Sequence, residues 1–147
     1  MTKIADYRKL LGVDKTADLK ALKTIYRNFM KDWHPDKFQD NQERLMAEEK
    51  SKQFIEAYHF LVSIAPETIA SAQTEYAALI ATSRIRDYHY KGQILQINFL
   101  DGSVYEYFDV SKNIYNKLLN AETPDRFARR HIYHSFVYRK VSKALAD

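Results

Sequence analysis

The spacing of apolar residues changes near residue 83, and this change constrains the fold more than any other feature of the sequence. Before it, apolar residues recur every three or four positions, as in amphipathic helices. After it, short runs alternate apolar and polar residues and are separated by Lys91-Gly92 and Asp101-Gly102, two dipeptides typical of hairpin turns. The sequence therefore predicts two modules, an all-α module followed by a small α+β module.

The first module should span residues 1–65 and consist of a short helix and two longer, antiparallel ones. Thr16 is the expected N-cap of the second helix. This helix should end near Trp33, because Pro35 disfavours helical backbone in the residue before it. A third helix, over about residues 42–65, should pair with the second across a short loop.

The second helix has two distinct faces. At about 100° per residue, its apolar side chains fall within an arc of about 140°, which should pack in the core. These residues are Leu19, Leu22, Ile25, Tyr26, Phe29, Met30 and Trp33. A neighbouring stripe about 80° wide holds Lys20, Lys23, Arg27 and Lys31. Taken alone, such a stripe is more often a solvated helix face than a binding surface.

Pro66 and Glu67 predict the start of a further helix. Proline is tolerated at the first helical position, and an acidic side chain suits the positive end of the helix dipole. The apolar stripe that follows is thin and lies among alanines. We expect residues 66–82 to form a helix that connects the two modules.

The second module should span residues 83–147 and contain a three-stranded antiparallel meander with two helices. The expected strands cover residues 85–90, 94–99 and 104–108. In the middle strand Leu95, Ile97 and Phe99 share one face, so this face of the sheet should be buried. A helix capped by Ser111 should cover it, and a second, short helix should begin at Thr123-Pro124-Asp125. The covering residues are Ile114, Tyr115, Leu118 and Leu119.

Composition excludes several classes of site. The chain of 147 residues has no cysteine, so disulfides and cysteine-ligated zinc are ruled out. No run of about 18 apolar residues is present to span a membrane, and the first residues lack the apolar core of a secretory signal. We therefore expect a soluble, cytoplasmic protein without membrane association.

Positive charge is concentrated towards the C-terminal end. The formal net charge is +4, but residues 126–147 alone hold six Lys/Arg and one Asp. This asymmetry suggests an acidic partner, nucleic acid or protein, although a solvated basic tail explains it equally well.

The tripeptide His34-Pro35-Asp36 lies at the expected bend between the second and third helices. The bend should present an imidazole and a carboxylate outward, beside the positive stripe. Taken alone, the tripeptide indicates only a turn that ends a helix, since three fixed residues occur by chance at roughly the per-cent level in a chain of this length.

The residues around this tripeptide make it specific. DYRKLLGVDKTADLKALKTIYRNFMKDWHPDKF, together with EAYHFL at residues 56–61, closely resembles the J-domain of DnaJ-type co-chaperones, over about residues 4–64. The resemblance implies a co-chaperone that docks on a DnaK-type heat-shock chaperone and stimulates its ATP hydrolysis. It implies that His34, Pro35 and Asp36 are the trigger. The implied docking surface consists of Lys23, Arg27 and Lys37, with Tyr26 at its border. We add Lys20 and Lys31 of the same positive stripe as candidate chaperone-binding residues.

Three positions depart from the pattern of that family. Asn28 stands where a second basic residue is common, and Phe38 stands where a polar residue is usual. Ser51 occupies a position often held by a core phenylalanine.

The second module resembles the KTSC domain, a small module found at the C-terminus of some lysyl-tRNA synthetases. The resemblance rests on LQINFLDGSVYEYFDV, on the helix that follows it and on FARRHIYHSFVYRKV, and it covers roughly residues 83–141. The synthetase context suggests RNA binding for that family, whereas the client of a co-chaperone is not implied by either resemblance.

The C-terminal residues allow an alternative function, that of an RNA-binding adaptor with weak or no chaperone stimulation. From Arg126 to Lys143 there are six Lys/Arg, two histidines, three Tyr/Phe besides Phe127 and no acidic residue. Such a mixture can neutralise phosphates and stack on bases. The candidate residues for binding RNA or a protein partner are Arg126, Arg129, Arg130, His131, Tyr133, Arg139 and Lys140. A client or protein partner fits this surface at least as well.

No motif predicts catalysis, a metal or a cofactor. His131 and His134 have a spacing that suits metal ligation on a helix, but no cysteine or third histidine completes a site. Asp87 and His89 alternate on one strand, but no nucleophile or phosphate-binding loop accompanies them. We therefore expect a protein that acts by binding and not as an enzyme.

Overall fold

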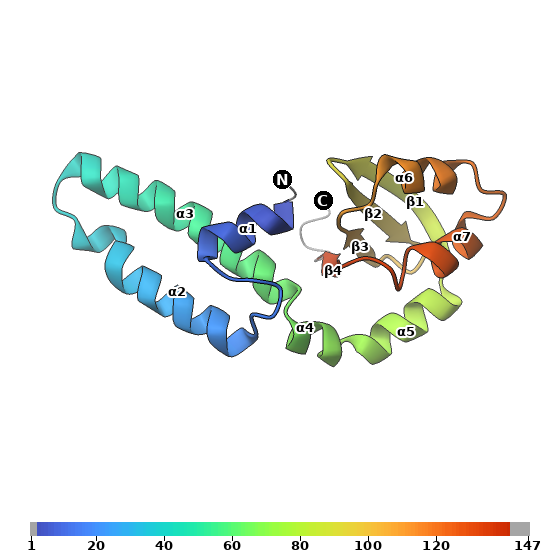
Figure 1. The fold of residues 1–147 in the computed structure, drawn as a ribbon, viewed down its shortest axis with the longest axis horizontal. Coiled ribbons are helices and arrows are strands. Elements are labelled where there is room, and N and C mark those ends of the chain that lie inside the picture. Colours follow the sequence, from blue (N-terminus) through green and yellow to red (C-terminus); the bar gives the residue numbers. More distant parts are fainter. Residues whose placement is uncertain (1–2, 142–147) are drawn as a thin grey trace. The chain divides into compact units, whose positions relative to one another are not determined.

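A computed structural model describes residues 3–141 and divides them into two compact units, Lys3–Thr68 and the residues from Ile69 onward (Figure 1). The first unit is helical, and the second combines a four-stranded antiparallel sheet with helices. The predicted fold class is confirmed, and the sheet has one strand more than the predicted meander. Among the described residues, no helix has both the length and the apolar character that crossing a membrane requires.

The first unit is organised around its longest helix. Its elements are α1 (Lys3–Leu11), α2 (Leu19–Trp33), the 3-10 turn η1 (Pro35–Lys37) and α3 (Asn41–Ser63). Both α1 and α2 pack on α3. The rings of Phe29 and Phe54 stack with their centroids 3.7 Å apart, and those of Tyr26 and Tyr58 stack at 4.3 Å. The buried apolar residues are Ile4, Leu11, Leu22, Ala47, Phe54, Ala57, Phe60, Leu61 and Ala65.

Helix α2 begins later than the sequence predicted. Its N-cap is Asp18, whose carboxylate accepts a hydrogen bond from the backbone N of Ala21 at 2.8 Å. Thr16, the predicted cap, instead donates its backbone N–H to the side chain of Asp14 at 2.8 Å. That bond closes an Asx turn before the helix, so the prediction of Thr16 as the N-cap is wrong. The predicted end at Trp33 is confirmed, because His34 has extended backbone angles.

The segment expected to form one connecting helix forms two, α4 (Pro66–Ser71) and α5 (Gln73–Thr82). The backbone of Ala72 separates them, with φ −101° and ψ 6°. The side chains of Tyr76 and Ile80 are buried with the core of the second unit. Helix α5 is therefore part of that core and does more than connect the modules.

The sheet of the second unit is a meander in the order β1-β2-β3-β4, with every neighbouring pair antiparallel. Its strands are β1 (Ile85–Lys91), β2 (Ile94–Phe99), β3 (Val104–Tyr107) and β4 (Tyr138–Val141). The sequence did not predict β4, which has four residues and pairs with β3 only after two helices. A strand this short contains too few alternations to stand out in the sequence.

Helices α6 (Lys112–Leu119) and α7 (Pro124–His131) pack with α5 against the face of β2 that was predicted to be buried. Ser111 caps α6 as predicted, accepting a hydrogen bond from the backbone N of Ile114 at 3.3 Å. Leu118 is buried, but Leu119 is 49% exposed, so its predicted place in the core is wrong. Adjacent helical residues point about 100° apart, and only one of this pair faces the sheet.

Tyrosines from α5, β3, β4 and the turn after α7 meet in this core. The hydroxyl of Tyr76 lies 3.0 Å from that of Tyr107 and donates to the backbone O of Tyr133 at 2.8 Å. The ring of Tyr76 also stacks on Tyr138, with centroids 3.9 Å apart. Burial raises the pKa of Tyr105 to about 12. Burial also raises the pKa of Tyr76, Tyr107 and Tyr133 well above the ordinary value.

Raising the pH above 10.0 should destabilise the second unit. A buried tyrosine with a folded-state pKa above the unfolded value of 10.0 stabilises the fold fully below pH 10.0. This stabilisation is lost as the pH rises through the folded-state pKa, which is about 12 for Tyr105. The free energy of unfolding in urea should therefore fall from about pH 10 upward. The phenolate absorbance of the buried tyrosines should appear only as the sheet unfolds; full ionisation in the intact fold would contradict this assignment.

Asp18→Ala should lower the free energy of unfolding of the first unit by about 1 kcal/mol, because the backbone N–H of Ala21 loses its acceptor. Asp18→Asn keeps a capping oxygen and should cost less. Trp33 is the only tryptophan, so its fluorescence during urea titration follows this unit specifically. A larger loss for Thr16→Ala than for Asp18→Ala would argue against Asp18 as the cap.

Candidate functional site

The bend between α2 and α3 is closed by its own backbone. Pro35 opens the turn η1, and its fixed φ suits the first helical position. The backbone N of Lys37 donates to the carbonyl O of His34 at 3.0 Å, and the N of Phe38 donates to the O of Pro35 at 3.1 Å. The tripeptide therefore lies in a hydrogen-bonded turn.

His34 and Asp36 both point into solvent, as the sequence predicted. Their side chains are 47% and 91% exposed. The Nδ1 atom of His34 accepts a hydrogen bond from the backbone N of Asp36 at 3.2 Å and lies 3.6 Å from a carboxylate oxygen of the same residue. Because Nδ1 accepts, the neutral ring carries its proton on Nε2, which stays available for a partner.

The positive stripe of α2 is exposed along its whole length. Lys20, Lys23, Arg27 and Lys31 all face solvent, and Lys37 in the turn does too. None of these five cations forms an ion pair within residues 3–141. Tyr26 is half-buried against Tyr58, which places it at the border between this surface and the core.

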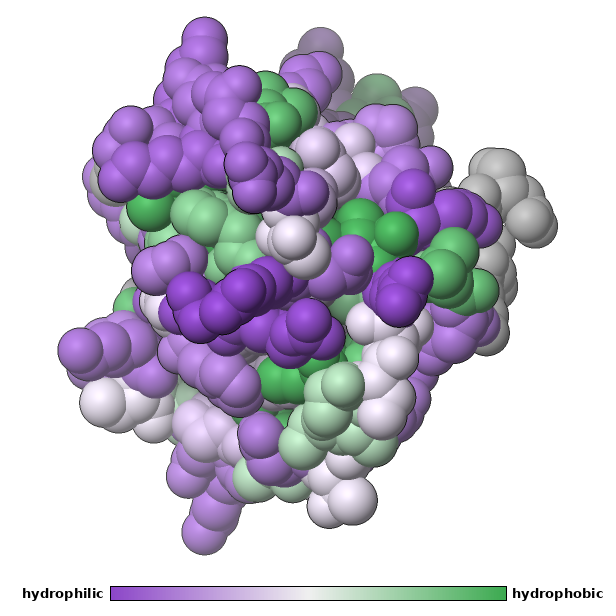
Figure 2. All heavy atoms as spheres, turned by 90° about the vertical axis from the view of Figure 1, so that its right-hand side faces the viewer, coloured by the Kyte–Doolittle hydropathy of each residue, from purple (hydrophilic) through white to green (hydrophobic). Residues whose placement is uncertain are grey.

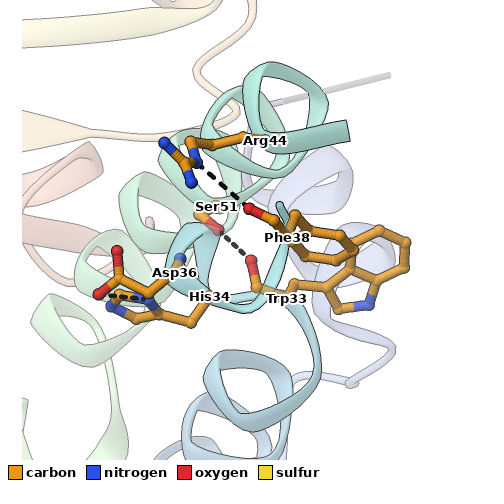
Figure 3. A network of polar contacts seen from close by, with 6 residues as sticks. All are labelled: Trp33, His34, Asp36, Phe38, Arg44 and Ser51. Atoms are coloured by element: carbon orange, nitrogen blue, oxygen red, sulfur yellow. Dashed lines mark hydrogen bonds and ion pairs between the residues drawn. The ribbon is translucent and has the colours of Figure 1, made fainter. Parts of the chain in front are cut away.

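Two residues of α3 that the sequence did not single out as site residues form hydrogen bonds to the backbone on either side of the turn (Figure 3). The hydroxyl of Ser51 donates to the carbonyl O of Trp33 at 3.1 Å, and the Nε of Arg44 donates to the carbonyl O of Phe38 at 3.3 Å. The only sequence signal was the departure of Ser51 from the expected phenylalanine. A serine at an otherwise apolar position indicates a nearby hydrogen-bond partner.

The predicted C-terminal patch is only partly assembled. Arg126, Arg129, Arg130 and His131 are all exposed on α7. A shallow hollow there is lined by Thr123, Arg126, Phe127 and Arg130, among others. Figure 2, which views the side on which α7 lies in Figure 1, shows strongly hydrophilic side chains gathered in the middle of that face.

Three other members of that patch are engaged within the fold. Tyr133 is 2% exposed, so its prediction as a surface residue that stacks on bases is wrong. The Nε of Arg139 donates to a carboxylate oxygen of Glu106 at 2.7 Å, and the Nζ of Lys140 donates to Glu75 at 2.5 Å. Both pairs form because β4 joins the sheet beside β3, which the sequence did not reveal. Lys143 lies outside the described residues.

The groups considered for metal or acid–base chemistry are separated or already bonded. Helix α7 ends at His131, so His134 does not share its face. The carboxylate of Asp87 accepts a hydrogen bond from the side chain of Asn98. Within residues 3–141, no group of three His, Cys, Asp or Glu is arranged to hold a metal.

In comparison with known proteins, one segment of each unit matches the model of a different protein family. Residues 6–67 match the family model of the DnaJ domain, and residues 81–136 match that of the KTSC domain. Over 56 residues the chain is 46% identical to the chaperone protein DnaJ of Thermoplasma volcanium, an alignment that covers 38% of this chain and 15% of that protein.

Two further relatives carry different names. The curved DNA-binding protein of Pseudomonas putida strain W619 is 46% identical over 38% of this chain and 16% of its own length. The DnaJ homolog subfamily B member 8 of Mus musculus is 45% identical over 40% of this chain and 25% of its own length. The chain therefore spans a quarter or less of the length of these relatives.

Proposed function

We propose that this chain, which contains a DnaJ domain at residues 6–67 followed by a KTSC domain at residues 81–136, is a co-chaperone of a DnaK-type heat-shock chaperone. It docks through the turn at His34, Pro35 and Asp36 and through the positive face of α2, and it stimulates ATP hydrolysis by the chaperone. The observation that carries the proposal is the hydrogen-bonded turn, which displays an imidazole and a carboxylate beside exposed cations.

The two parts of this surface suit two steps of docking. Unpaired cations on one helix face attract an acidic partner over a distance set by the ionic strength, which makes association salt-sensitive. The turn then supplies directional hydrogen bonds that fix the orientation of the partner. Such a surface favours a fast, transient encounter.

In this proposal the chain supplies no group that breaks a bond. By binding one conformation of the chaperone more tightly than another, it shifts the chaperone towards the state that hydrolyses ATP. The second unit then serves to bind a client or another protein partner. The three exposed arginines of α7 favour an acidic surface on that partner.

His34→Gln should abolish the stimulation of ATP hydrolysis while the fold is retained, because the turn loses its imidazole. Lys23→Ala and Arg27→Ala should each raise the concentration for half-maximal stimulation by about threefold at low salt, with a smaller effect at high salt. Single-turnover hydrolysis by a DnaK-type chaperone measures all three variants.

Lys52→Ala is the matched control, since Lys52 is an exposed cation on α3 and not on α2. An effect of Lys52→Ala equal to that of Lys23→Ala would show that overall charge matters and the face of α2 does not. A wild-type protein that gives no stimulation would reject the proposed function.

A second function, an RNA-binding adaptor, is favoured by one observation. Arg126, Arg129 and Arg130 lie close together on the short helix α7 and form no ion pair within residues 3–141, so all three are available to phosphate groups. Stacking groups are scarce, however, because Tyr133 is buried. The outer face of the sheet instead carries a polar cross-strand row of His89, Gln96, Glu106 and Arg139. We therefore rank this function second.

If the chain binds RNA through α7, the double variant with Arg129→Ala and Arg130→Ala should weaken binding and lower the slope of log K against log salt by about 1.5. Fluorescence anisotropy with a single-stranded RNA over a salt series measures both quantities. Lys112→Ala with Lys117→Ala, on α6, is the charge-matched control. If the wild type does not bind RNA at low salt, the RNA-binding function is rejected.

A further inference from the structure

We infer that Ser51 and Arg44 are positioning residues that hold both ends of the docking turn and thereby fix His34 and Asp36. This inference deepens the proposed function and rests on it for its effect on a chaperone. The geometry itself is independent of any partner.

The first anchor lies at the end of α2. The last carbonyl groups of a helix have no partner within that helix. The O of Met30 accepts from the backbone N of His34, and the O of Trp33 accepts from the hydroxyl of Ser51 at 3.1 Å. Ser51 is 4% exposed, so it cannot itself touch a docked protein. Its hydroxyl acts only through the backbone that leads into the turn.

The second anchor lies where the chain leaves the turn. The carbonyl O of Phe38 accepts from the Nε of Arg44 at 3.3 Å, while the N of Phe38 donates back to Pro35. Arg44 lies in the first turns of α3, whose start is fixed by Asp40, the acceptor for the backbone N of Glu43 at 3.1 Å. Both ends of the turn are thus tied to the same helix.

The two residues whose carbonyl groups are bound by Ser51 and Arg44 also contact each other through their rings. The rings of Trp33 and Phe38 stack with centroids 6.1 Å apart, and the Nζ of Lys50 lies 3.6 Å from the centroid of the Trp33 ring. Figure 3 shows these rings on one side of the turn and the side chains of His34 and Asp36 on the other. The groups that hold the turn are therefore separate from the groups that it displays.

This separation predicts how the anchors act. A turn that is already ordered spares a partner the entropy cost of ordering it on binding. Loosening an anchor should raise the concentration of the protein needed for half-maximal stimulation. The maximal stimulation should stay the same, because His34 and Asp36 are unchanged and reach the same bound geometry at saturation.

The test is Ser51→Ala in the full chain, with Ser63→Ala as its matched control. Ser63 also lies in α3 and donates to a backbone carbonyl, that of Phe60, but far along the helix from the turn. In the free protein, Ser51→Ala should increase acrylamide quenching of Trp33 and speed amide exchange at Lys37 and Phe38. With a DnaK-type chaperone, the half-maximal concentration should rise about fivefold at unchanged maximum. Ser63→Ala should behave as wild type in each measurement.

A second variant guards against loss of the fold, because Arg44 is exposed. Arg44→Lys keeps the charge but removes the planar Nε–H donor, so it should loosen the turn without altering electrostatic attraction. The inference is overturned if folded Ser51→Ala and Arg44→Lys both show wild-type quenching and exchange, or if they lower maximal stimulation at an unchanged half-maximal concentration. A wild type that fails to stimulate the chaperone rejects the proposed function, while quenching and exchange still decide whether the anchors hold the turn.

Discussion

The backbone restriction imposed by Pro35 determines the architecture of the first unit. It disfavours helical angles in His34, so α2 ends at Trp33, and its fixed φ starts the turn η1. Helix α3 can then return along α2, and the stacked rings of Phe29 and Phe54 lock the pair together. Because one face of α2 is used in this packing, its charged residues are left on a neighbouring, solvent-facing stripe that leads to the turn. The end of α2 at Trp33 therefore allows α3 to pack on α2 and also leaves the turn and the charged stripe exposed to solvent.

The two units use polar groups in opposite ways. In the first unit, charged side chains stay in solvent and the buried hydroxyl of Ser51 serves the backbone. In the second, tyrosine hydroxyls lie inside the core, where Tyr76 bonds to both Tyr107 and Tyr133. Helix α5 contributes Tyr76 and β4 contributes Tyr138, although both residues lie outside the segment, residues 81–136, that matches the KTSC family. The structural unit in this chain is therefore larger than the matched segment.

Local patterns predicted the parts of the fold that depend on local physics. Helical periodicity gave α2 and α3, alternation gave the first three strands, and Pro35 gave the exposed turn. The wrong N-cap has a local cause, whereas the surroundings of Tyr133, Arg139 and Ser51 depend on contacts between residues distant in sequence. Thr16 and Asp18 are both able to cap a helix. Asp18 is the cap, because Thr16 forms a hydrogen bond with Asp14 instead. The burial of Tyr133 and the pairing of Arg139 depend on where the chain runs after α7. The role of Ser51 depends on a carbonyl group across the hairpin.

The late position of β4 has a consequence for biosynthesis. Strand β3 pairs on one side with β2, its neighbour in sequence, and on the other with β4, so that Tyr107 lies opposite Tyr138. While the chain is being made, the first unit can fold from helices that are close in sequence as soon as they leave the ribosome. The sheet, however, keeps an open edge at β3 until the residues of β4 emerge, and an open edge can pair with the wrong strand. A nascent chain stalled between α7 and β4 would thus contain a folded helical unit joined to an incomplete sheet, whose unpaired β3 edge is prone to aggregation.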